Sequence, residues 1–144
     1  MLYIIKQVEL AVRAHMEAAL KKEDITTHQY TALTVLLHRD GLSAAALARN
    51  SFVTAQTMGE MLATLERRGL VTREVDPDNR RRTLTCLTAQ GHELLDRYRL
   101  VMEDLEDDMA ESLTFRQREA LRGYLNICRT NLEGSPRRRR ERKA

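Results

Sequence analysis

The sequence predicts a mostly α-helical protein with one small β-hairpin. Its 144 residues include only two prolines and six glycines, so long stretches contain no residue that breaks a helix. Apolar residues recur at helical spacing over most of the chain. Between residues 71 and 87 the spacing changes to every second residue, which is typical of paired strands.

The first helix is predicted over residues 2–22, and its apolar arc is wider than a surface helix needs. Such a helix must be covered on most sides, and a short chain offers little to cover it. Thr26 or Thr27 can cap a second helix that runs to about His38. The residues expected to face inward from this second helix are Tyr30, Leu33, Leu36 and Leu37.

Two helices are predicted next. Ser43 caps a short helix over residues 44–49, and Thr54 caps a longer one over about 55–68. Gly69 stands where a helix ends in a left-handed residue, and Leu70 can fold back onto Leu65 in a Schellman motif.

The hairpin and two further helices complete the pattern. Residues 71–75 and 83–87 alternate as strands around a long tip that carries three arginines. Thr88 starts a helix to about Glu111, and Thr114 caps a last helix. The first of these helices has a heptad-like apolar stripe formed by Leu95, Tyr98, Met102, Leu105 and Met109. The inner face of the last helix is formed by Leu121, Leu125, Cys128 and Leu132.

Residues 43–88 therefore have the order of a winged helix-turn-helix, whose second helix enters the major groove of DNA. Small polar residues at the start of that helix can bond phosphates and base edges, and the hairpin arginines can reach phosphates or a narrow minor groove. Glu60 repels phosphate there, although it can accept a hydrogen bond from cytosine. The predicted DNA-binding residues are Thr54, Ala55, Gln56, Thr57, Glu60, Asp78, Arg80, Arg81 and Arg82.

Several segments of the chain form a recognisable series in their order and spacing: residues 25–30 with Leu33, Leu47-Ala48, residues 53–58, 65–73, 76–81 and 87–91. The most specific part is the Asp-x-Arg of Asp78 and Arg80, followed by Leu87-Thr88-x-x-Gly91. In these segments, and over nearly its whole length, the chain resembles the multiple antibiotic resistance regulator (MarR) family of bacterial transcription factors.

The resemblance implies a homodimer in which the first, fifth and sixth helices of two subunits intertwine. It implies a single domain over residues 1–132, with the DNA-binding lobe at 43–88 and dimerisation helices at 1–24 and 89–132. It also implies that Arg80 enters the minor groove while Asp78 holds it by a charge-assisted hydrogen bond. Many members bind small aromatic acids, so Arg13, His15, His28 and Tyr30 are the candidates for binding an aromatic or anionic effector.

The net charge of +3 comes from one segment. Residues 137–143 carry six positive charges and one negative, which leaves −2 for the rest of the chain. We interpret residues 133–144 as a flexible basic tail that contacts phosphates without reading sequence. The negative remainder and Glu60 keep an alternative open, a winged-helix protein-interaction module that does not bind specific DNA; the three hairpin arginines favour the DNA-binding regulator.

Several other classes are disfavoured. No apolar run approaches the roughly 18 residues needed to cross a membrane, so a cytoplasmic protein is expected. The four histidines show no metal-ligand spacing, and no catalytic motif or cofactor site is recognised, so neither an enzyme nor a metal protein is expected. Cys86 and Cys128 form no CxxC, and Cys128 is expected to be a buried small apolar residue.

Overall fold

The computed structural model describes residues 1–133 and divides the chain into two compact units, Met1–Leu105 and a second unit that begins at Glu106. The predicted fold class, mostly helical with one small β-hairpin, is confirmed. Apart from Glu133, the segment interpreted as a basic tail lies outside the described residues.

The first unit opens with helix α1 (Leu2–Leu20), which continues into a single 3-10 turn, η1 (Lys21–Glu23). Helix α2 (Thr27–His38) follows, and Thr26 is its cap. The Thr26 hydroxyl oxygen accepts from the backbone N–H of Gln29 (3.1 Å), and the Gln29 side-chain oxygen accepts from the backbone N–H of Thr26 (3.0 Å). This reciprocal capping box fixes where α2 begins.

Helices α3 (Ala44–Asn50) and α4 (Ala55–Arg67) are capped by Ser43 and Thr54, as predicted. Helix α4 ends in the predicted Schellman motif. Gly69 has a φ of +70°, and the backbone N–H groups of Gly69 and Leu70 donate to the carbonyls of Glu66 (2.9 Å) and Leu65 (3.0 Å).

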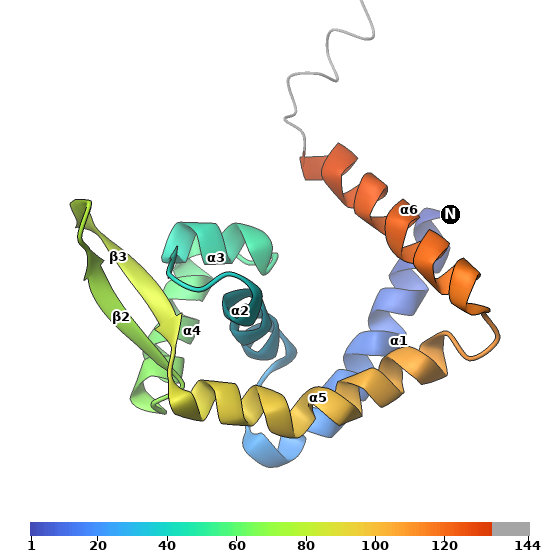
Figure 1. Cartoon of the computed structure of the whole chain (residues 1–144), viewed down its shortest axis with the longest axis horizontal. Helices are drawn as coiled ribbons and strands as arrows, with labels where there is room; N and C mark the ends of the chain where they lie inside the picture. Colours follow the sequence, from blue (N-terminus) through green and yellow to red (C-terminus); the bar gives the residue numbers. More distant parts are fainter. Residues whose placement is uncertain (134–144) are drawn as a thin grey trace, which may run out of the picture. The chain divides into compact units, whose positions relative to one another are not determined.

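Three antiparallel strands form one sheet in the order β1-β3-β2, with β1 at Leu42–Ser43, β2 at Val71–Asp76 and β3 at Asn79–Leu87. The two-residue strand β1 was not predicted, because two residues are too few to show alternation. The predicted long hairpin tip is wrong, since the strands run on until only Pro77 and Asp78 separate them. Figure 1 shows the hairpin of β2 and β3 projecting from this unit beside α4.

The core of the first unit joins α2, α3, α4 and the start of α5 (Ala89–Met109). Its fully buried side chains include Leu33, Leu47, Met58, Leu65 and Leu94. Gly91 allows α5 to approach this core closely, because a Cβ atom there would lie 2.3 Å from the Leu70 carbonyl oxygen. The start of α5 is thereby fixed against the end of α4.

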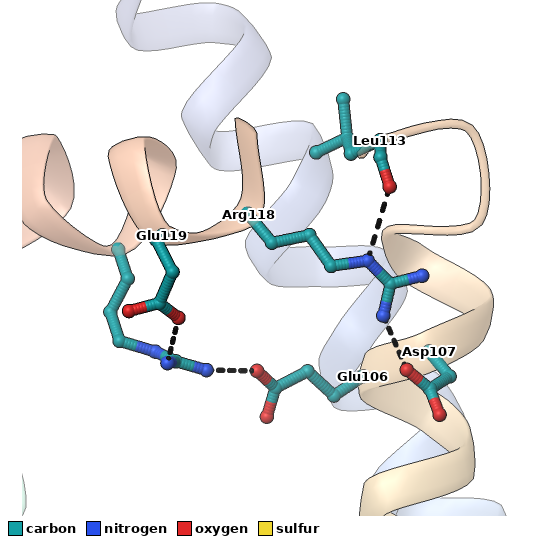
Figure 2. A network of polar contacts seen from close by, with 6 residues as sticks. Glu106, Asp107, Leu113, Arg118 and Glu119 are labelled. Atoms are coloured by element: carbon teal, nitrogen blue, oxygen red, sulfur yellow. Dashed lines mark hydrogen bonds and ion pairs between the residues drawn. The ribbon is translucent and has the colours of Figure 1, made fainter. Parts of the chain in front are cut away.

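In the second unit, the last turn of α5 is tied to α6 (Phe115–Glu133) by two arginines of α6 (Figure 2). Arg118 forms an ion pair with Asp107 and donates to the Leu113 carbonyl at 3.3 Å. Arg122 contacts Glu106 at 2.9 Å and Glu119 of its own helix at 2.6 Å. These exposed pairs set the turn between the helices, although each contributes little stability in water.

Large apolar side chains of α1 and α6 are exposed in the single chain. In α1 they include Leu2, Tyr3, Ile4, Ile5, Val8 and Leu10, and in α6 Phe115, Leu121, Tyr124, Leu125, Ile127 and Leu132. The expectation that Cys128 is buried is wrong for the single chain, where it is exposed. The reason is that α6 buries none of its residues within the chain as described. Across residues 1–133, no helix is long and apolar enough to span a membrane.

Candidate nucleic-acid interface

The first turns of α4 present a polar surface on a helix whose other side is buried. Met58, Met61, Leu62 and Leu65 pack into the core, whereas all five predicted DNA-binding residues of this helix start are exposed: Thr54, Ala55, Gln56, Thr57 and Glu60. The Thr54 hydroxyl accepts from the Thr57 backbone N–H (3.1 Å) and contacts the Thr57 hydroxyl (2.9 Å). Backbone N–H groups and the helix dipole make this end favourable for a phosphate oxygen.

Gln56 and Glu60 form a polar pair one turn apart on this surface. The Gln56 amide donates to the Glu60 carboxylate at 3.4 Å. Together they present an amide, which can donate and accept, and a carboxylate, which only accepts. Such groups can distinguish base edges in a major groove, with the carboxylate suited to the amino group of cytosine.

The three wing arginines bulge out of β3. Val75 pairs with Thr83, but the next residue of β2, Asp76, pairs with Asn79. Arg80, Arg81 and Arg82 therefore have no partners on β2, and all three side chains are exposed. The hairpin thus displays three guanidinium groups outside the backbone pairing of its strands.

The expected pairing of Asp78 with Arg80 is wrong. The carboxylate that organises the wing belongs to Asp76, which is 2% exposed. Its oxygens accept from the Asp78 backbone N–H at 2.9 Å and from Arg82 Nε at 2.7 Å. Spacing in the sequence suggested Asp78, two residues before Arg80, as the acid that holds an arginine. The turn instead brings Arg82 beside the buried Asp76. Within residues 1–133, the Asp78, Arg80 and Arg81 side chains make no hydrogen bond or ion pair.

The contacts of Asp76 make wing stability depend on pH. The Asp78 N–H and the Arg82 guanidinium hold the pKa of Asp76 below its ordinary value. Because the folded pKa is lowered, this contribution is complete above the ordinary carboxyl pKa and is lost as pH falls through the lower, folded value. Asp76→Asn should lower the free energy of unfolding at neutral pH but not at strongly acidic pH. Urea denaturation of both proteins across this range measures the difference, and a difference that does not change with pH would contradict the assignment.

A further ion pair ties the wing to α4. Arg73 of β2 donates through Nε to the Glu66 carboxylate of α4 at 2.8 Å. Sequence reasoning missed both Arg73 and Asp76. The Asp76-Pro77 dipeptide is a usual turn signal and could have identified the acid, but no sequence pattern pairs Arg73 with Glu66. This pair and the Schellman motif hold wing and helix as one body.

A hollow of about 540 Å³ lies beside α1 and α2 and contains two of the four predicted effector residues, Arg13 and His28. Its walls are mainly apolar. Arg13 donates to Glu9 at 2.8 Å, and the Ser51 hydroxyl is buried in the wall with no hydrogen-bond partner among residues 1–133. The other two predicted effector residues do not line the hollow. His15 is exposed, and Tyr30 lies in the core, where its ring packs edge-to-face with that of Tyr98 at a centroid distance of 6.5 Å.

Comparison with known proteins gives a consistent result. The model of the MarR family matches residues 23–82. The HTH-type transcriptional repressor Rv2887 of Mycobacterium tuberculosis is 31% identical over 123 residues, which cover 85% of this chain and 88% of the relative. The chain belongs to the MarR family. The predicted resemblance is confirmed, and the family consists of transcriptional regulators.

Two other MarR comparisons add detail. The transcriptional regulator HosA of Escherichia coli O111:H- is 40% identical over 72 residues, which are 50% of this chain and 53% of HosA, so the matched part spans about half of that relative. The transcriptional repressor CouR, solved bound to a 23-mer DNA duplex, is 28% identical with a TM-score of 0.77, covering 89% of this chain and 91% of CouR.

Two further observations on this MarR chain concern metal ions and thiols. Residues 1–133 contain no cluster of three or more histidine, cysteine or acidic side chains that could hold a metal ion. Partial burial raises the pKa of the Cys86 thiol, which disfavours the reactive thiolate.

Proposed function

We propose that this MarR protein is a transcriptional repressor that binds a specific DNA operator as a homodimer. The observation that carries the proposal is the combination, on one compact unit, of an exposed polar helix start at α4 and a bulge on the wing that exposes three arginines. The relatives named as repressors, and CouR bound to a DNA duplex, support the same role.

In this proposal α4 enters the major groove and the wing follows the DNA backbone. Gln56, Thr57 and Glu60 contact base edges, and the free N–H groups behind Thr54 bind a phosphate. Arg80 and Arg81 are available for a narrow minor groove or its phosphates, whereas Arg82 is occupied by Asp76. The lobe at residues 43–88 therefore supplies the contacts that read the sequence.

The homodimer is supported by the exposed apolar side chains of α1 and α6. Ile4 is 62% exposed and Ile127 58% exposed in the single chain. Exposed apolar surface of this kind is costly in water and marks a protein–protein contact. A two-fold symmetric dimer carries two copies of α4, so the operator has two half-sites about one helical turn, ~34 Å, apart.

The hollow beside α1 and α2 is the proposed effector site. Its apolar walls suit an aromatic ring, and the unpartnered Ser51 hydroxyl offers a hydrogen bond. An aromatic carboxylate can take the place of Glu9 on Arg13. We propose that such a ligand releases the protein from DNA, that the protein acts in the cytoplasm, and that it catalyses no reaction.

A gel-shift assay with the DNA that flanks its own gene tests the proposed function. We expect a shift that resists competitor DNA, a footprint with two half-sites, and release as substituted benzoates are titrated in. A protein that binds every sequence equally, or none, would contradict the proposal and favour the protein-interaction module. A stable shift that no aromatic acid reverses would contradict only the effector site.

A further inference from the structure

Arg68 makes the longest-range backbone contacts of any α4 side chain. It is the C-cap of α4, and its guanidinium reaches 44 and 45 residues back along the chain. Nη1 donates to the Asp24 carbonyl at 2.7 Å, and Nη2 donates to the Glu23 carbonyl at 2.6 Å. One planar group thus binds two successive carbonyls at the connection between α1 and α2.

Those carbonyls need such a partner. The last carbonyls of a helix have no N–H group ahead of them in their own helix, and they carry the negative end of its dipole. Here α1 and η1 end at Asp24, which has a left-handed φ of +50°. The guanidinium of Arg68 supplies both missing donors and a compensating positive charge.

The connection itself is a firm anchor. Leu20 before it is fully buried and Ile25 after it is 5% exposed, so the core holds both ends of the turn. Arg97 of α5 adds an ion pair with the Glu23 carboxylate at 3.2 Å. A side chain bound to this turn is therefore bound to α1, α2 and α5 together.

We propose that Arg68 is a positioning residue for DNA recognition: it fixes the C-terminal end of α4 so that the N-terminal end meets the bases at the right angle. This role rests on the DNA-binding function proposed above. The helix is about 20 Å long at 1.5 Å per residue, so a shift at Arg68 tilts the reading end. Both terminal nitrogens of the guanidinium already donate to carbonyls, and in this proposal Arg68 acts without touching DNA.

The choice between arginine and lysine separates this role from an ordinary phosphate contact. Lysine keeps the charge, but its single ammonium group lacks the planar fork that spans two carbonyls. Arg68→Lys should therefore lose about tenfold in operator affinity, in the range found for residues that affect binding without touching the ligand, and Arg68→Ala should lose at least as much. Affinity for nonspecific DNA and the salt dependence of binding should stay unchanged in Arg68→Lys, because no phosphate contact disappears.

Arg67 provides the matched control. It is adjacent and exposed, and its side-chain hydrogen bonds within the described residues stay in its own helix, at the Ala63 carbonyl (3.4 Å) and the Thr64 hydroxyl (3.2 Å). Arg67→Lys should bind the operator like the wild type. Fluorescence anisotropy on operator and scrambled DNA at several salt concentrations, with thermal melting and sedimentation of each variant, measures all these quantities.

The outcomes are distinct. Arg68→Lys that melts like the wild type, stays dimeric and loses operator affinity selectively supports the positioning role. Arg68→Lys that binds like the wild type while Arg68→Ala flattens the salt slope shows a phosphate contact and overturns it. Wild-type protein that binds no specific DNA overturns the proposed function and this role with it. If the wild type binds the operator specifically and both Arg68 variants bind it with the same affinity, the positioning role is overturned while the proposed function stands.

Discussion

Replacing Tyr124 and Ile127 of α6 with glutamate should convert the protein to monomers at micromolar concentration and abolish operator binding. Both side chains are more than half exposed in the single chain, at 67% and 58%, so the chain loses little of its own packing. In a dimer they would be buried, and each unpaired charge would then cost several kcal/mol. A monomer presents only one α4 to an operator that has two half-sites, so specific binding fails as well.

Analytical ultracentrifugation of the double variant measures the change, with circular dichroism to check that the helices remain. Asn126→Glu is the control for adding a glutamate to α6, because it places one such charge on the polar side of the helix, near Arg122 and Arg129 in the sequence. We expect this control to sediment like the wild type. A wild type that is monomeric, or a double variant that stays dimeric, would refute the assembly through α6.

The second large effect is expected at the wing. Arg80→Ala should weaken operator binding by about 1–3 kcal/mol, the range for one well-placed arginine contact. The Arg80 side chain makes no hydrogen bond or ion pair within the described chain. Binding to DNA therefore costs it only bound water and conformational freedom, and breaks no interaction within the protein. For the same reason the melting temperature should stay close to that of the wild type.

Two comparisons sharpen this test of the wing. Asp78→Ala should leave affinity nearly unchanged, because the acid that organises the wing is Asp76. Arg99→Ala removes the same charge from α5, where Arg99 pairs with Glu103 at 2.8 Å, and serves as the control for net charge. Operator affinity that is equal in Arg80→Ala and the wild type would show that Arg80 does not contact the operator.

The sequence was sufficient for the elements of the fold and insufficient for contacts between distant residues. Thr26, Thr54 and Gly69 act within a few residues of themselves, and local rules for caps and helix ends identified all three. Arg68 acts on carbonyls 44 and 45 residues away, and Arg73 acts across from strand to helix. Those contacts depend on the tertiary fold, which brings distant segments together, and the spacing of residues in the sequence does not predict them.

The candidate site divides in the same way. Residues that face solvent from a well-specified helix, such as Gln56 and Thr57, were assigned from periodicity and are exposed in the structure. The wing was harder because its register breaks: three residues of β3 are skipped between Val75 and Asp76. Alternation cannot predict such a bulge, since a one-residue slip reverses every side chain. The mistaken pairing of Asp78 with Arg80 follows from that break.

The bulge also separates two properties that are usually coupled in a hairpin, the stability of its strand pairing and the side chains that it exposes to a ligand. The ladder from Val71 to Val75 holds the strands, and the buried Asp76 closes the turn, so Arg80 and Arg81 contribute almost nothing to folding. Residues with no structural duty can change without loss of stability. Under the proposed function, substitutions at these two positions would change how strongly the wing binds DNA, while α4 would still contact the same bases. The strength of DNA binding could then evolve independently of its sequence preference.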